Sequence, residues 1–149
     1  MDNNTFSIER ITTPSQDVVD VLNQLMQQLN SEIQALTLDT LENIVQSDDT
    51  YLFVVKDSTV QKIVGTLTLI VYQTPSGKRG YIEDVVVDEN SRGKGLGKKL
   101  MEEGIKKAQE LNLEYVGLTS RPEREAANAL YQRLGFQKRD TNVYRLMIQ

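Results

Sequence analysis

Apolar residues recur along the first third of the chain with two different periods. In residues 5–12, TFSIERIT, apolar and polar positions alternate, which is typical of an edge strand. In residues 15–29 and 37–47 the apolar positions fall three and four residues apart, which is the spacing of one face of an α-helix. Ser15 opens the first of these segments, and Thr37 is the predicted N-cap of the second. We therefore expect one strand followed by two helices.

The middle of the chain has the period of a sheet. Residues 50–57, TYLFVVKD, and 62–73, KIVGTLTLIVYQ, predict two strands joined by a short turn. Residues 74–80 contain a proline and a glycine, so they predict a hairpin to the next strand. That strand, residues 81–88, YIEDVVVD, is apolar nearly throughout around two acidic residues. Such a run is typical of a strand that is buried on both faces.

The C-terminal half begins with a glycine-rich loop and a helix that we expect to end near residue 111. Residues 114–120, EYVGLTS, predict a strand, and 123–136, EREAANALYQRLGF, predict a helix with Gly135 as its C-cap glycine. The ending FQKRDTNVYRLMI predicts two short strands around DTN. The predicted order is β-α-α-β-β-β-α-β-α-β-β, a mixed α/β layout with helices covering a sheet. Because no repeat or linker is visible, we expect a single domain over residues 1–149.

Composition excludes several kinds of chemistry. The 149 residues include no cysteine and no histidine, which excludes disulfides, thiolate metal sites, a Ser-His-Asp triad and the usual zinc ligand, so we expect no metal. The N-terminus has no basic start before an apolar run, and no stretch has the eighteen or so apolar residues of a membrane span. We therefore expect a cytoplasmic protein without a membrane partner. A net charge of −4 argues against nucleic-acid binding and makes a local cluster of cations informative.

Such a cluster occurs in SRGKGLGKKL, residues 91–100, between a buried strand and a helix start. Unpaired amides at a helix N-terminus attract anions, and glycine lets the backbone approach a phosphate closely. A Walker A motif fails because Lys99 stands where serine or threonine is needed. The dinucleotide fingerprint G-x-G-x-x-G fails because its third glycine is missing in either register. The pattern R-x-x-G-x-G is met by Arg92, Gly95 and Gly97.

With its flanks, IEDVVVDENSRGKGLGKKLMEEGIKKA, this loop resembles the acetyl-coenzyme A binding motif of the GNAT superfamily of N-acetyltransferases. AANALYQRLGF is similar to the family's second signature, and the element order matches the family's layout over nearly the whole chain. The resemblance implies a central mixed, mostly antiparallel sheet flanked by helices, with acetyl-CoA as cosubstrate. It places the pyrophosphate on the loop amides and the pantetheine arm along the preceding strand. The implied cofactor-binding residues are Val85, Val86, Val87, Arg92, Gly93, Lys94, Gly95, Leu96, Gly97, Lys98, Asn128 and Tyr131.

The resemblance also implies direct attack of an amine on a thioester carbonyl, and no cysteine is present to form an acyl-enzyme. Tyr131 is the expected general acid for the leaving thiolate. Glu83 is the candidate general base, with an ordered water as the alternative. Because side chains alternate along a strand, we expect only one of Glu83 and Asp84 to face the cleft. A purely structural role stays open for both residues: Tyr131 could pack its ring in the core, and Glu83 could bond to neighbouring backbone.

The acceptor amine has weaker signals. Arg121 and Glu83 are the candidate substrate-binding residues; Arg121 could pair with a phosphate or carboxylate of the substrate, bind a cofactor phosphate, or cap nearby carbonyls. In this family the first two helices usually wall the acceptor site, and acidic residues there would favour a cationic amine: Glu32, Asp39, Glu42, Asp48 and Asp49. We expect a small-molecule or peptide amine and, as in many family members, a homodimer. The rival function is a non-catalytic acyl-CoA sensor or partner-binding module of the same fold.

Overall fold

A computed structural model describes residues 5–149, which form two compact units, one extending to Leu118 and the other covering Thr119–Gln149. That the chain forms a single domain stays a prediction. The second unit contains α4 (Glu125–Arg133). The elements of the first unit are β1 (Phe6–Arg10), α1 (Gln16–Leu29), α2 (Leu38–Gln46), β2 (Thr50–Asp57), β3 (Lys62–Thr74), β4 (Gly77–Val87), the 3₁₀-helix η1 (Glu89–Ser91), α3 (Leu96–Glu110) and β5 (Val116–Gly117). Along residues 5–149, no helix has the length and apolar character needed to cross a membrane.

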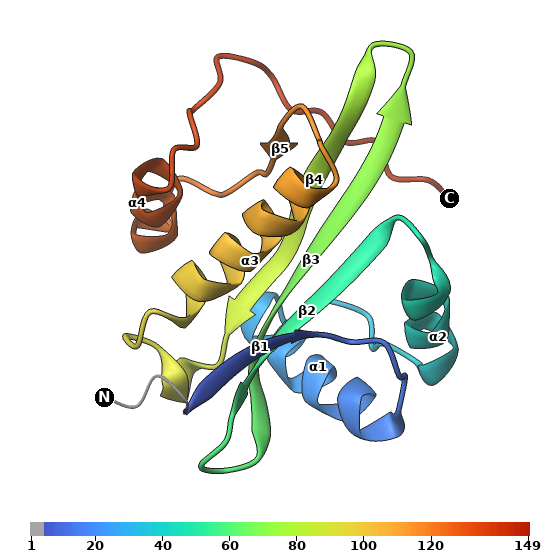
Figure 1. Cartoon of the computed structure of the whole chain (residues 1–149), viewed down its shortest axis with the longest axis vertical. Coiled ribbons are helices and arrows are strands. Elements are labelled where there is room, and N and C mark those ends of the chain that lie inside the picture. Colours follow the sequence, from blue (N-terminus) through green and yellow to red (C-terminus); the bar gives the residue numbers. More distant parts are fainter. Residues whose placement is uncertain (1–4) are drawn as a thin grey trace. The chain divides into compact units, whose positions relative to one another are not determined.

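The strands described in the first unit form one five-stranded sheet in the order β1-β2-β3-β4-β5 (Figure 1). β1 to β4 are antiparallel neighbours, which confirms the predicted mixed, mostly antiparallel sheet. β5 runs parallel to β4 and pairs with it at only two positions, Gly80 with Val116 and Tyr81 with Gly117. Within the described part of this unit, residues 82–87 of β4 therefore have no strand partner on the β5 side.

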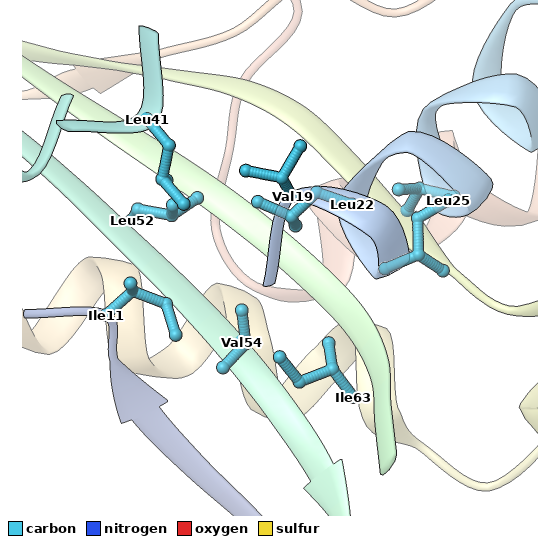
Figure 2. Close-up of a cluster of buried hydrophobic side chains, with 9 residues drawn as sticks. Ile11, Val19, Leu22, Leu25, Leu41, Leu52, Val54 and Ile63 are labelled. Atoms are coloured by element: carbon cyan, nitrogen blue, oxygen red, sulfur yellow. The ribbon is translucent and has the colours of Figure 1, made fainter. Parts of the chain in front are cut away.

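Helices of the first unit cover both faces of this sheet. α1 and α2 pack on one face, where their apolar stripes meet side chains of β2 and β3 (Figure 2). α3 covers the other face, where its Leu100 lies next to Val55 and its Gly104 lies against Leu67. Burying such a side chain contributes about 1.5–3 kcal/mol, so these contacts hold the sheet between the two helical layers. The core on the α1–α2 face consists of Ile11, Val19, Leu22, Leu25, Leu41, Leu52, Val54, Ile63 and Val86.

The two predicted N-terminal helices begin where their caps indicate. The Ser15 hydroxyl accepts a hydrogen bond from the Val18 amide at 3.3 Å. The Thr37 hydroxyl accepts one from the Thr40 amide at 3.2 Å, which confirms Thr37 as an N-cap. Each bond provides a partner for an amide that the helix itself leaves unpaired.

The end of α4 in the second unit confirms Gly135 as a C-cap glycine. Gly135 has φ +102°, a left-handed conformation that a side chain disfavours. The Phe136 amide donates to the Tyr131 carbonyl at 3.0 Å, and the Gly135 amide donates to the Gln132 carbonyl at 3.1 Å. This is the Schellman pattern, and its usual apolar contact is present between the Tyr131 and Phe136 rings, whose centroids lie 6.1 Å apart.

The prediction of two strands at the C-terminal end was wrong, and the strand before them is shorter than predicted. Of the strand expected over residues 114–120, only Val116–Gly117 forms, and residues 136–149 form no strand. The described residues of the second unit contain no other strand, so an extended segment there has no edge within the unit to satisfy its backbone groups. Its large apolar side chains stay exposed: Val143, Tyr144, Leu146, Met147 and Ile148.

Replacing Gly65 by alanine is expected to destabilise the first unit. A Cβ at this position of β3 would lie 2.8 Å from Val55 Cγ1 and 3.2 Å from the Val86 carbonyl oxygen. Because backbone cannot rotate away, we expect the free energy of unfolding to fall by about 1–3 kcal/mol, as for other overpacked cores. Urea denaturation measures this loss. Gly117→Ala is the matched control, since its Cβ meets only the Tyr81 ring at 3.4 Å; equal losses in both variants would contradict the explanation.

Candidate active site

β4 contains a bulge at its acidic pair. Glu83 lies opposite Thr68 and Val86 lies opposite Thr66, so two residues of β4 oppose a single residue of β3 between these pairs. Asp84 has φ +54°, a left-handed conformation that few residues other than glycine adopt, aspartate being among the more tolerant. The bulge therefore interrupts the regular alternation of side chains along β4.

A pocket of about 430 Å³ lies on the α1–α2 face and includes Asp84 in its wall. Its lining residues come from α1, the α1–α2 loop, α2 and the three central strands. Seven are apolar: Leu22, Met26, Ile33, Ala35, Leu36, Ile44 and Leu52. Five carry uncharged polar groups: Gln34, Thr37, Thr40, Thr66 and Thr68. Among the described lining residues, Asp84 alone carries a charge.

The apolar setting changes the acidity of this carboxyl group. Desolvation by burial raises the pKa of Asp84 above its ordinary value of 3.8. Within residues 5–118 its carboxylate has no hydrogen-bond or ion-pair partner that would favour the charged form. A carboxylate with a raised pKa accepts a proton more readily, so Asp84 is suited to take one from a bound amine.

The sequence argument for Glu83 needs revision. Glu83 is not among the pocket-lining residues, although its cross-strand neighbour Thr68 is, and cross-strand neighbours point to the same face of a sheet. The sequence predicts that only one of Glu83 and Asp84 faces the cleft, and of the two only Asp84 lines this pocket, where the bulge interrupts the alternation. Sequence reasoning preferred Glu83 of the two, and the tolerance of aspartate for left-handed backbone is the one available signal for Asp84. The catalytic role of Glu83 stays a prediction.

The edge of β4 that faces away from β3 offers backbone groups to a ligand. The Asp88 amide donates to a carbonyl of β3 at 2.8 Å, so alternation directs the backbone of Val87 and Val85 to the opposite edge. Arg92 Nε donates to the Val87 carbonyl at this edge at 3.0 Å. Val86 instead buries its side chain in the core, and the same alternation directs its backbone groups toward β3.

The glycine loop leads into α3 through unpaired amides. Gly95 is the N-cap with φ +75°, and having no side chain it makes no capping bond. The first bond within the helix runs from the Lys99 amide to the Gly95 carbonyl at 3.1 Å, so the amides of residues 96–98 lack helical partners. Gly93 also has positive φ, +80°, and a Cβ at either glycine would meet no atom within 4 Å. The loop therefore combines left-handed backbone with open space.

The loop and the first turn of α3 carry four cations: Arg92, Lys94, Lys98 and Lys99. None of them forms an ion pair with a carboxylate of residues 5–149. Lys94 and Lys99 instead place their ammonium groups 5.6 and 6.0 Å from the centre of the Phe6 ring. Lys94 also interacts electrostatically with the Asp57 carboxylate, whose pKa is lowered first by the hydrogen bonds from Thr59 and further by Lys94. The loop keeps an excess of positive charge at this helix N-terminus, which can hold an anion.

The remaining predicted residues lie in the second unit. Asn128 Nδ2 donates to the Arg121 carbonyl at 2.9 Å, so this amide ties the start of α4 to the preceding loop. Tyr131 lies one turn further along α4. Desolvation by burial raises the pKa of the Tyr131 phenol above its ordinary value of 10.0, and the Arg124 guanidinium offsets part of that rise. The phenol therefore keeps its proton at neutral pH.

Comparison with curated proteins shows partial matches to acetyltransferases. Part of the chain is 44% identical over 71 residues to mycothiol acetyltransferase of Paenarthrobacter aurescens (strain TC1), which covers 48% of this chain and 22% of that protein. It is 43% identical over 58 residues to glucosamine 6-phosphate N-acetyltransferase of Arabidopsis thaliana, covering 37% of this chain and 39% of that one. The matches thus span less than half of either relative's length.

Solved structures match over nearly the whole chain. The crystal structure of the Arabidopsis thaliana glucosamine-6-phosphate N-acetyltransferase superposes with a TM-score of 0.81 at 26% identity, covering 97% of this chain and 100% of that one. An aminoglycoside acetyltransferase from an uncultured soil metagenomic sample, in complex with trehalose, superposes with a TM-score of 0.85 at 22% identity, covering 99% and 98%, and this second likeness concerns the fold.

The family model described as "Acetyltransferase (GNAT) family" matches residues 18–136, which includes β4, the glycine loop and α4. This protein therefore belongs to the GNAT acetyltransferase family, whose members use acetyl-CoA.

Proposed function

We propose that this chain is an acetyl-CoA-dependent N-acetyltransferase that transfers the acetyl group to a primary amine by direct attack. The observation that carries the proposal is the carboxylate of Asp84, which faces a pocket from a strand whose free edge and following loop suit the cofactor. Membership of the GNAT family supports the choice of donor. We expect a small-molecule or peptide acceptor, and cytoplasmic location and a homodimer stay predictions.

The residues of the first unit fit the donor. Acetyl-CoA supplies an acyl group activated as a thioester. The amides of residues 96–98 and the cations of the loop would hold its pyrophosphate, since they present donors and positive charge at one helix N-terminus. The edge groups of Val85 and Val87 would bond the amides of the pantetheine arm, in the manner of an added strand. A backbone amide of this strand would also stabilise the oxyanion.

Asp84 would prepare the acceptor. A primary amine is protonated at neutral pH, and an ammonium ion has no lone pair for attack. Asp84 accepts one proton from the amine, directly or through water, and the neutral nitrogen then forms the new bond to the carbonyl carbon. The C–S bond would break after this attack, and the second proton of the nitrogen would pass to solvent water. Tyr131 would donate a proton to the departing thiolate, which restores a neutral thiol, and solvent water would return a proton to the Tyr131 phenolate.

Release of free thiol from acetyl-CoA, measured across a panel of primary amines, tests the proposal. We expect amine-dependent thiol release together with a stoichiometric acetylated product. Tight binding of acetyl-CoA without turnover of any amine would instead support a non-catalytic acyl-CoA sensor.

Lys98→Ala is expected to weaken donor binding. The side chain is exposed in the first turn of α3, so its removal takes one positive charge from the anion site without disturbing the core. The KM for acetyl-CoA should rise by up to about fivefold, since an exposed charge contact is worth up to about 1 kcal/mol, while kcat changes little. Lys106→Ala, exposed further along the same helix, is the matched control. Equal KM values for the two variants would refute this role of Lys98.

Asp84→Asn is expected to lower kcat by about 10²- to 10⁴-fold, the usual contribution of a general base. Asparagine tolerates the left-handed backbone at this bulge, so the fold should persist. Glu83→Gln, one residue away, is the comparison: if it abolishes turnover while Asp84→Asn does not, Glu83 is the base, as the sequence suggested.

Because the pKa of Asp84 is raised, the difference in stability between wild type and Asp84→Asn should depend on pH. Burial disfavours the charged carboxylate, so the stability associated with protonated Asp84 is fully present below its unfolded pKa and is lost as pH rises through the folded pKa. Asp84→Asn should therefore be at least as stable as wild type at pH 7, with the difference vanishing in acid. Urea denaturation at both pH values measures this. In the pH profile of wild-type kcat/KM, the apparent pKa of the acid limb should lie above 3.8, the ordinary pKa of an aspartate side chain.

Tyr131→Phe is expected to lower kcat severely with little change in the KM for acetyl-CoA. The variant keeps the ring that packs edge-on against Phe136, so the end of α4 is preserved and only the hydroxyl is lost. Steady-state kinetics with circular dichroism as a folding check measures the effect. Unchanged turnover would assign Tyr131 to packing alone.

A further inference from the structure

We infer that the acceptor is a primary monoamine with a compact apolar body, of the arylalkyl or branched-alkyl type. This inference rests on the proposed function and names the substrate class of the same pocket. It follows from the charge of the pocket wall, from the state of its hydroxyl groups and from the way the α1–α2 loop is held.

The charge of the wall indicates one cationic group on the acceptor. Among the described lining residues no lysine or arginine is present, and Asp84 is the one carboxylate. A phosphate would therefore enter without a cation to bind it and would meet a negative charge. A polycation would leave all but one of its ammonium groups among apolar side chains. A single ammonium group directed at Asp84 meets neither penalty.

Some of the polar groups of the wall are engaged inside the protein. Thr66 Oγ1 donates to the Phe53 carbonyl at 2.8 Å. Thr37 Oγ1 donates to Thr40 Oγ1 at 3.1 Å while it also caps α2. Thr37 and Thr66 thus use their hydroxyl hydrogens inside the protein, which leaves the side chains of Gln34, Thr40 and Thr68 as the uncharged donors of the wall. A sugar ring, whose hydroxyls each need a partner, would find too few here.

The loop wall is fixed before any ligand arrives. Asn23 of α1 bonds both backbone groups of Leu36, donating from Nδ2 to the carbonyl at 3.1 Å and accepting from the amide at 2.7 Å. The Asn30 carbonyl accepts from the Ile33 amide at 3.2 Å. Ile33 and Leu36 are therefore held as parts of a preformed apolar wall. The volume of about 430 Å³ suits a small ligand, and the seven apolar side chains suit a hydrocarbon body.

This chemistry differs from that of the molecules named for the relatives. Glucosamine 6-phosphate carries a phosphate and several hydroxyls, and aminoglycosides carry several ammonium groups. The pocket lining provides a counterpart for one ammonium group and for an apolar surface. The shared fold therefore accommodates a different acceptor in this chain.

The test measures kcat/KM of the chain of residues 1–149 for four amines at saturating acetyl-CoA. Phenethylamine represents the inferred class, glucosamine its polar counterpart, glucosamine 6-phosphate adds the phosphate, and sisomicin represents polycations. We expect phenethylamine to exceed glucosamine by at least about tenfold, as apolar pocket contacts discriminate, and glucosamine 6-phosphate to be poorer still.

A pair of lysine variants ties the selectivity to this pocket. Ile33→Lys places a cation in the loop wall, so kcat/KM for phenethylamine should fall by about tenfold, while the ratio of glucosamine 6-phosphate to glucosamine should rise. Gln27→Lys adds the same charge on an exposed part of α1 outside the lining and should leave both values unchanged. Thermal denaturation checks that both variants fold. If Ile33→Lys does not fold, Ala35→Leu narrows the same wall and should penalise phenethylamine more than the shorter ethylamine.

The outcomes separate the inference from the proposed function. If all four amines leave the thioester intact while acetyl-CoA binds, the acetyltransferase proposal fails and the inference falls with it. If amines are acetylated but glucosamine 6-phosphate or sisomicin is preferred over phenethylamine, the inference is overturned and the acetyltransferase proposal stands. A preference for phenethylamine that Ile33→Lys reverses and Gln27→Lys leaves intact establishes the inference.

Discussion

The left-handed backbone of Asp84 in β4 is the constraint on which the candidate site depends. Without this bulge, residues 82, 84 and 86 would share one face of the sheet. With it, Ile82 lies near Gly104 of α3, while Val86 joins the core under α1 and α2. The bulge thus lets one strand turn Ile82 toward α3 while Asp84 and Val86 face the α1–α2 side. A strand that must do both needs one extra residue at the switch.

The two halves of the proposed reaction use different parts of the chain's chemistry. The donor would be bound through backbone groups, namely the amides at the start of α3 and the edge groups of Val85 and Val87. These groups are present whatever side chains occupy the positions. The acceptor would be contacted by side chains from α1, the following loop and α2. Substitutions that change the acceptor therefore need not disturb the donor site. This division is consistent with a family that has one donor and many acceptors.

Sequence reasoning predicted the parts of the fold that depend on local chemistry. Thr37 and Gly135 are caps whose hydrogen bonds involve residues close to them in the sequence. The unpaired amides and the cations of the glycine loop likewise lie within ten consecutive residues. The bulge was missed because EDVVVD contains no glycine to mark it, and aspartate alone is a weak signal. The pocket was missed because its wall combines residues 22 to 84, including a loop without periodicity. The two final strands were predicted from alternation alone, which cannot supply the partner strand that a sheet requires.

The hydrogen bond from Arg92 to the Val87 carbonyl also bears on how the edge of β4 avoids uncontrolled pairing with a strand of another chain. A strand edge without a neighbour can pair with a strand of another chain. In β4 this edge belongs to a segment that ends in three consecutive valines, residues 85–87. The guanidinium places a charge on one of the few carbonyls this edge presents, and the kink at Asp84 interrupts the straight run that a second strand would need. The features proposed to receive the donor thus also protect the exposed edge from aggregation.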